Sequence, residues 1–109
     1  MATDLDLLQG TLDLLILKTL AWGPRHGYAV AQWIRDTTDQ ALHIEEGALY
    51  TALHRMEKRA WLRAEWGLSE NNRRAKYYEL TRSGRKQLDA EQEQWRKLTT
   101  AVSLVLDMG

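Results

Sequence analysis

The sequence of 109 residues contains no cysteine, so it can form neither a disulfide framework nor a metal site with thiolate ligands. A reducing cytosol is compatible with this absence, and we expect a cytoplasmic protein. The chain also lacks a long uninterrupted apolar run. The segment LDLLILKTLAW is broken by Asp13 and Lys18 and is too short to span a bilayer. We interpret it as part of a buried helix and expect no membrane partner.

Motifs of enzyme active sites are missing as well. The sequence has no Gly-x-Ser-x-Gly motif and no phosphate-binding glycine loop. Its histidines, His26, His43 and His54, do not have the spacing of metal ligands. Glu45 and Glu46 are neighbours on a predicted helix, so they do not share a face as an acid–base pair would. We predict that the protein is not an enzyme and has no metal or cofactor.

The formal net charge is zero, but the charges are distributed unevenly. Residues 1–49 carry three basic and seven acidic side chains, residues 50–86 carry ten and four, and residues 87–109 carry two and four. Because charges more than about 8 Å apart are largely screened at physiological salt, a polyanion responds to the local surplus. The basic middle segment of this single domain is therefore a candidate for binding nucleic acid.

Residues 44–81 combine a helical pattern with a strand pattern. Apolar residues first recur at helical spacing, which predicts an amphipathic helix: Leu49, Leu53, Met56 and Ala60. Residues 62–66 then alternate between apolar and polar, and after a polar tip at 67–74 a second strand is predicted at 75–81. A helix followed by a hairpin with a basic tip favours a mainly α-helical winged helix-turn-helix fold with a small β-hairpin wing.

The segments before this region are predicted to be helical too. The first helix, over residues 4–22, has apolar residues on two faces. It is either a central core helix, or a helix that meets its own domain on one face and a second subunit on the other. Gly23 and Pro24 end it, and a second helix follows at about residues 26–37. Residues 42–44 are predicted to form a short strand that pairs with the wing.

Thr81 is predicted to cap a last helix over residues 82–108, with apolar residues along a coiled-coil-like seam. A helix of about 27 residues would reach about 40 Å, longer than the body of such a domain. We therefore expect a second copy as its partner, the alternative being a helix folded back on its own chain. Residues 1–81 form the predicted DNA-binding domain and residues 82–109 the dimerisation helix, packed as one structural unit. The candidate dimer residues are Leu8, Leu12, Leu15, Leu88, Trp95, Leu98, Val102 and Val105.

The exposed face of the third helix and the wing hold the candidate DNA contacts. Arginine can bind guanine edges through two hydrogen bonds, tyrosine and threonine can anchor phosphates, and a basic wing can enter a minor groove or lie on phosphates. The alternatives are a solvated helix surface and a loop that is polar only to protect the hairpin. The candidate residues are Tyr50, Thr51, His54, Arg55, Lys58, Arg73, Arg74 and Lys76.

Three stretches resemble the PadR-type bacterial transcriptional regulators, and together they cover nearly the whole chain. They are LQGTLDLLILKTLAWGPRHGYAVAQWI, EEGALYTALHRMEKRAWL and NNRRAKYYELTRSGRKQL. The chain is similar to the short branch, which has a single C-terminal helix. The resemblance implies a homodimer, joined through its first and last helices, that binds a two-fold symmetric operator and represses transcription. It implies that Tyr50 and basic residues of the third helix face DNA and that Lys76 lies in the wing.

The resemblance also implies that flat aromatic compounds bind in the dimer interface of some members, near a tryptophan comparable to Trp95. From its seam position, Trp95 either fills the dimer core or forms part of an aromatic slot for such a ligand. The chain departs from the family pattern at Thr51, where proline is common, and at Ala60, where glycine is usual. Neither change undoes the fold, since proline would fall in the first turn of the helix.

Two functions remain open at this level. The preferred hypothesis is a dimeric DNA-binding regulator, released from its operator by a small aromatic ligand. The alternative is a winged-helix module that binds a protein partner, favoured by the neutral net charge and by Trp33 and Trp66 as candidate surface aromatics. A steep loss of duplex affinity with added salt would distinguish the first from the second.

Overall fold

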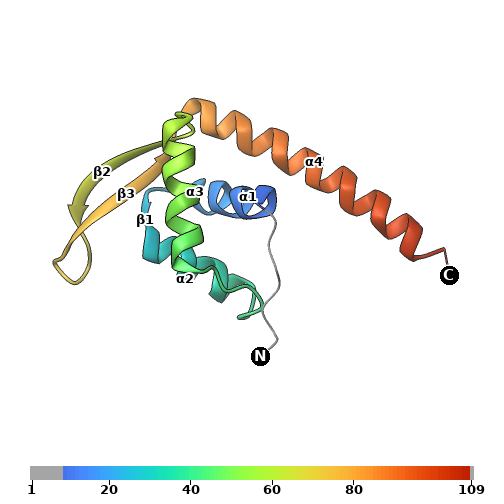
Figure 1. The fold of residues 1–109 in the computed structure, drawn as a ribbon, viewed down its shortest axis with the longest axis horizontal. Helices are drawn as coiled ribbons and strands as arrows, with labels where there is room; N and C mark the ends of the chain where they lie inside the picture. The colour runs from blue at the N-terminus through green and yellow to red at the C-terminus, as the bar shows by residue number, and fades with distance from the viewer. Residues whose placement is uncertain (1–8, 109) are drawn as a thin grey trace.

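The computed structural model of the protein describes residues 9–108, in which four helices accompany a small antiparallel sheet (Figure 1). The helices are α1 (Gln9–Leu20), α2 (Gly27–Thr37), α3 (Glu46–Lys58) and α4 (Arg82–Leu106). The strands are β1 (Arg25–His26), β2 (Leu62–Leu68) and β3 (Arg74–Leu80), in the order β1-β3-β2. The predicted fold class is confirmed: a helical body, a hairpin wing and a long final helix.

Helix α1 is the centre of the core. It packs against α2, α3, α4 and β3, which explains why its sequence is apolar on most sides. Ile16 and Leu17 are completely buried, together with Leu53 and Met56 of α3. Tyr78 closes the core from the sheet. The contact of one face of α1 with its own domain is therefore confirmed for the residues described, while a contact of the other face with a second subunit stays a prediction. Helix α1 ends at Leu20, two residues earlier than predicted.

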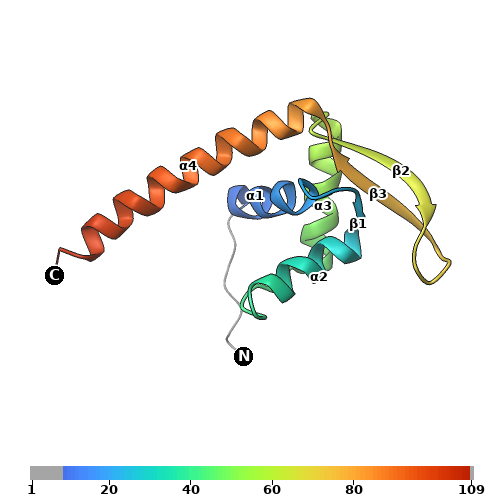
Figure 2. The same ribbon diagram turned by 180° about the vertical axis from the view of Figure 1, so that it is seen from behind.

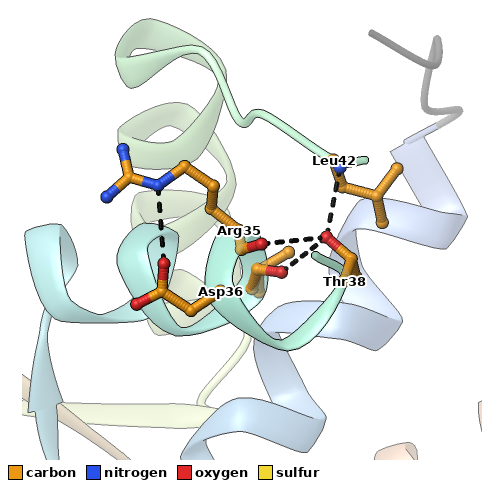
Figure 3. Close-up of polar contacts among 5 residues, drawn as sticks. Arg35, Asp36, Thr38 and Leu42 are labelled. Atoms are coloured by element: carbon orange, nitrogen blue, oxygen red, sulfur yellow. Dashed lines mark hydrogen bonds and ion pairs between the residues drawn. The ribbon is translucent and has the colours of Figure 1, made fainter. Parts of the chain in front are cut away.

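The turn between α2 and α3 is held by Thr38 (Figure 3). Its hydroxyl donates to the carbonyl of Ile34 at 2.8 Å and accepts from the amide of Leu42 at 3.1 Å. The predicted strand at residues 42–44 is wrong, because this amide is bound within the turn and residues 42–44 run in irregular backbone. The strand beside the wing is instead β1, which pairs with β3. His26 of β1 is also the N-cap of α2: its backbone is extended, and its side-chain Nδ1 accepts a hydrogen bond from the amide of Ala29.

The connection from α3 to β2 is a tight left-handed turn. The amide of Ala60 donates to Glu57 and that of Trp61 to Met56, both at 3.0 Å, which is the Schellman pattern at a helix C-terminus. Ala60 has φ 63°, a conformation in which glycine is favoured. Ala60 is therefore exposed beyond the end of α3, and its predicted place on the buried stripe of that helix is wrong.

The start of α4 is packed against this turn. The Thr81 side chain accepts from the amide of Gly84 at 3.0 Å, which confirms the predicted N-cap, and the Thr81 amide donates to the carbonyl of Trp61 at 3.0 Å. Gly84 lies so close to this carbonyl that an added Cβ would overlap its oxygen. The first turn of α4 is thereby fixed relative to the base of the wing.

Beyond its first turns, α4 leaves the body of the molecule, as both views show (Figures 1 and 2). Leu88 is buried against the core, but the apolar residues further along the helix are exposed. These are Trp95, Leu98, Val102, Leu104, Val105, Leu106 and Met108. Within residues 9–108, no helix has both the length and the hydropathy needed to cross a membrane.

Candidate nucleic-acid interface

The outer face of α3 is open to solvent. Leu49, Leu53 and Met56 are buried on the inner side of the helix, so the residues on the opposite side are left exposed. Thr51 and His54 are exposed there. With Lys58, Arg59 and the edge of Arg55 they line a shallow depression along the helix. The structure therefore brings together most of the third-helix residues predicted from the sequence.

Tyr50 lies at the edge of this face, on the contact between α2 and α3. Its ring packs over Gly27, where an added Cβ would come within 2.8 Å of the ring and its hydroxyl. A glycine at the first position of α2 is thus what allows the two helices to approach around this ring. Tyr50 also lines a pocket that is shared with Tyr28 and Arg35 of α2. Its side chain remains 38% exposed.

Arg55 differs from the other predicted residues, because it has a partner inside the fold. Its two terminal nitrogens bind the two carboxylate oxygens of Asp13 at 2.7 and 2.8 Å. The Asp13 side chain is 7% exposed and that of Arg55 24%. The hydrogen bond to Asp13 raises the pKa of Arg55 above its ordinary value. The guanidinium thus joins α3 to α1, and its predicted role in reading a base stays a prediction.

Asp13 is the residue that sequence reasoning missed, because the pattern presents it only as an interruption of an apolar run. The available signal was its position in a helix with apolar residues on most sides, since a carboxylate buried there requires a cationic partner. Nothing in the sequence indicates which of the ten basic residues between positions 50 and 86 supplies that partner.

The three predicted cations of the wing differ in what they contact. Lys76 donates to Glu57 of α3 at 3.1 Å, and this hydrogen bond raises the pKa of the lysine. Arg74 instead places its guanidinium over the indole of Trp66, 4.6 Å from the ring centroid. Arg73 is exposed in the hairpin turn, where Asn72 has φ 60°. That turn spans residues 69–73, so the strands extend further toward the tip than predicted.

The predicted dimer residues separate into two groups. Leu12 and Leu88 are only 8% and 4% exposed and belong to the core of their own chain, so little of their surface remains for a partner. Leu15 is partly buried, and Leu8 lies outside the described residues. The four remaining candidates are exposed on α4: Trp95, Leu98, Val102 and Val105.

Trp95 borders a mostly apolar groove between α1 and α4. Gly10, Thr11 and Leu14 form the α1 side of this groove, and Leu98 follows Trp95 one turn along α4. The indole is 43% exposed, so the chain itself covers only part of it. Both interpretations of Trp95 therefore still apply, as part of a dimer core and as part of an aromatic slot.

Comparison with known proteins identifies the family. Residues 16–90 match the model of the transcriptional regulator PadR-like family. A transcriptional regulator from Clostridium thermocellum is 32% identical, with 87% of this chain and 92% of that chain covered and a TM-score of 0.80. A PadR family transcriptional regulator from Eggerthella lenta is 31% identical, with 93% and 86% covered and a TM-score of 0.77. One from Clostridium difficile is 29% identical, with 87% and 97% covered and a TM-score of 0.76.

The match extends from the last residues of α1 over α2, α3 and the wing to the start of α4. It therefore includes every element that carries an exposed cation of the candidate interface. Proteins of this family are transcriptional regulators and not enzymes. The chain belongs to the PadR-like family and is a DNA-binding transcriptional regulator.

Proposed function

We propose that the protein is a homodimeric repressor that binds a two-fold symmetric operator through α3 and the wing. The observation that carries the proposal is a set of exposed cations on one helix and the adjoining hairpin. Lys58, Arg59, Arg73 and Arg74 form no ion pair within residues 9–108. Cations that no carboxylate of the chain neutralises are the ones that can displace counterions from a DNA backbone.

Three other basic residues near this surface form ion pairs within the chain, which makes them weaker candidates for contacts with DNA. Arg55 is bound to Asp13, Arg63 to Glu79 and Lys76 to Glu57. A duplex would have to compete with these carboxylates, so we assign the three cations mainly to the fold. Thr51 and His54 then lie at the centre of the open α3 face, where hydrogen bonds to base edges confer specificity. Tyr50, which is partly exposed at the edge of that face, is proposed as a phosphate contact.

Dimerisation is supported by the far half of α4. This part of α4 extends away from the body, and within residues 9–108 its apolar residues from Trp95 to Met108 are left 43% to 84% exposed. A second α4 packed along Trp95, Leu98, Val102 and Val105 would bury this stripe. Two copies joined in this way would offer two α3 helices to one duplex, which suits an inverted-repeat operator in the bacterial cytoplasm.

For the effector, we propose a small planar aromatic molecule bound in the groove between α1 and α4. Its lining is predominantly apolar, and the Trp95 indole offers a face on which a flat ring can stack. Because α1 also carries Asp13, a ligand that displaces α1 would act on the helix that holds Arg55. In this proposal the ligand releases the protein from DNA.

Selection of bound duplexes from a random pool tests the DNA-binding part of the proposal. The expected product is an inverted repeat, bound with an affinity that falls steeply as salt rises. Replacing Lys58 by alanine should reduce the magnitude of the salt slope by about 0.9 for each phosphate that the variant no longer neutralises, whereas replacing Lys97 on α4 should leave it unchanged. Recovery of random sequence together with weak binding at low salt would contradict the proposal and favour a protein partner.

A further inference from the structure

We infer that Trp66 is a positioning residue for DNA binding, and that its indole holds the Arg74 guanidinium in place for a phosphate. The inference rests on the proposed function and adds to it a residue that need not contact DNA itself. Trp66 lies in β2 and Arg74 at the start of β3, on the two paired strands of the hairpin.

The register of the hairpin places these two side chains on one face. Trp66 is opposite Lys76, and Leu68 is opposite Arg74. Directly paired residues of an antiparallel ladder point to the same side, and residues two apart in one strand do so as well. Arg74 is therefore the diagonal neighbour of Trp66 toward the tip, which accounts for the distance of 4.6 Å between guanidinium and indole centroid.

This face of the wing is turned toward α3. Lys76, on the same face, reaches across to Glu57 of α3. The Arg74–Trp66 pair therefore lies one step further out along the surface that joins the wing to the open α3 face. A duplex bound to α3 would meet this surface with its backbone.

The burial of Trp66 shows that the ring is not held by the core. Along the same face the exposure increases from buried Leu62 to Trp66 at 57% and Leu68 at 65%. One face of the indole lies against the Arg74 guanidinium, 4.6 Å from the ring centroid. At 57% exposure the indole buries less surface than a core tryptophan would, and its contact with the arginine accounts for its place on the outer part of the wing.

Stacking suits the function of Arg74 because it leaves the donors free. A guanidinium that lies over an aromatic face still offers its N–H groups at the edge of its plane. Arg74 forms no ion pair within residues 9–108, so these donors have no carboxylate to bind. Ordering a flexible side chain on binding opposes association, and an arginine already held by a ring loses less freedom.

A double-mutant cycle on operator binding tests the inference. The variants are Trp66→Leu, Arg74→Met and the combination of the two, with Trp66→Phe as a variant that keeps an aromatic face. Leu68→Ala is the matched control, because it removes exposed apolar surface from the same face and leaves the pair intact. Urea midpoints for all five variants verify that the fold is retained.

We expect Trp66→Leu to weaken operator binding about three- to tenfold per wing. Trp66→Phe should recover most of this loss, and Leu68→Ala should bind as the wild type does. In the Arg74→Met background, Trp66→Leu should have no further effect, because its role is to hold the arginine.

The inference is overturned if Arg74→Met weakens binding while Trp66→Leu does not, a result that leaves the proposed function standing. It is also overturned if Trp66→Leu weakens binding as much in the Arg74→Met background as in the wild type, because the indole would then contact DNA directly. A wild-type protein that binds no duplex in a salt-dependent manner overturns both the inference and the proposed function.

Discussion

Arg55 and Asp13 are 42 residues apart in the sequence and bind each other through two parallel hydrogen bonds, at 2.7 and 2.8 Å. The pair joins the helix proposed to face DNA to the helix at the centre of the core. A bidentate contact of this kind fixes the relative orientation of the guanidinium and the carboxylate as well as their distance, because both groups are planar. The orientation of α3 relative to α1 is thus determined partly by this ion pair.

We predict that removing the cation is worse for stability than removing the anion. Arg55→Met would leave a nearly buried carboxylate without a partner, and should lower the free energy of unfolding by about 2–4 kcal/mol. Asp13→Asn leaves a guanidinium that water can still reach, and should cost about 1–2 kcal/mol. Urea denaturation of both variants measures the difference.

Operator selection with Arg55→Lys separates this role from base reading. If Arg55 contributes to binding through the fold, the preferred operator sequence should be unchanged. Relaxed preference at a single base pair, with the urea midpoint unaltered, would support the base-reading role that the sequence suggested.

Ala60→Gly is expected to stabilise the protein. Ala60 occupies the left-handed position after α3 with φ 63°, where a Cβ is unfavourable. Relief of this strain should outweigh the greater freedom of glycine in the unfolded chain, for a net gain of about 0.5–1 kcal/mol. The urea midpoint should rise without a change in slope. Ala48→Gly within α3 is the control, and should destabilise by a similar amount.

Stability should fall at alkaline pH. Burial raises the pKa of Tyr78 above its ordinary 10.0, and the hydrogen bond to Glu57 raises the pKa of Lys76 above 10.5. In both cases the folded state holds its proton more tightly than the unfolded chain does. The stabilisation is therefore complete below the ordinary pKa and is lost as pH rises through the folded-state pKa. Urea unfolding on either side of the ordinary tyrosine pKa of 10.0 measures this loss.

Tyr78→Phe is the control for that measurement. It should reduce the slope of stability against alkaline pH, because one of the two groups no longer titrates. An identical slope in the variant would exclude Tyr78 as a source of the effect.

Charges on the α4 stripe should prevent self-association. Leu98→Glu and Val105→Glu would each bring two like charges together in the proposed dimer, and should raise its dissociation constant by about a hundredfold or more. The fold should be retained, because both residues are exposed in the single chain. Sedimentation measures the mass. Thr100→Glu, near the opposite side of α4, should leave it unchanged, and stripe variants that still sediment as dimers would disprove this interface.

Local patterns were sufficient to predict the fold class. The buried positions Leu49, Leu53 and Met56 followed from their helical spacing, and the wing followed from the change to a period of two. The error at residues 42–44 has a local cause. A short apolar segment is compatible with a strand, but the hydroxyl of Thr38 binds the amide of Leu42 that the strand would have used.

The candidate site was predicted less completely, because pairing depends on distant parts of the chain. Periodicity places Arg55 beside Thr51 on the helix, but it cannot reveal that Asp13 binds it. In the same way, Leu12 and Leu88 were predicted to face a second copy, yet both are buried in the core of their own chain. The exposed residues Thr51, His54, Lys58 and Arg73 needed no partner and lie where they were expected.

The close approach of Gly84 to the Trp61 carbonyl also bears on operator geometry. A helix of 25 residues is about 37 Å long, so a tilt of about 10° at its base would move its far end by about 6 Å, nearly two base-pair steps. The backbone of Gly84 packs directly against the Trp61 carbonyl, so a tilt that moved the two closer together would make them overlap. In the proposed dimer, the distance between half-sites would then be determined by how a glycine sits on a carbonyl oxygen rather than by any contact with a base.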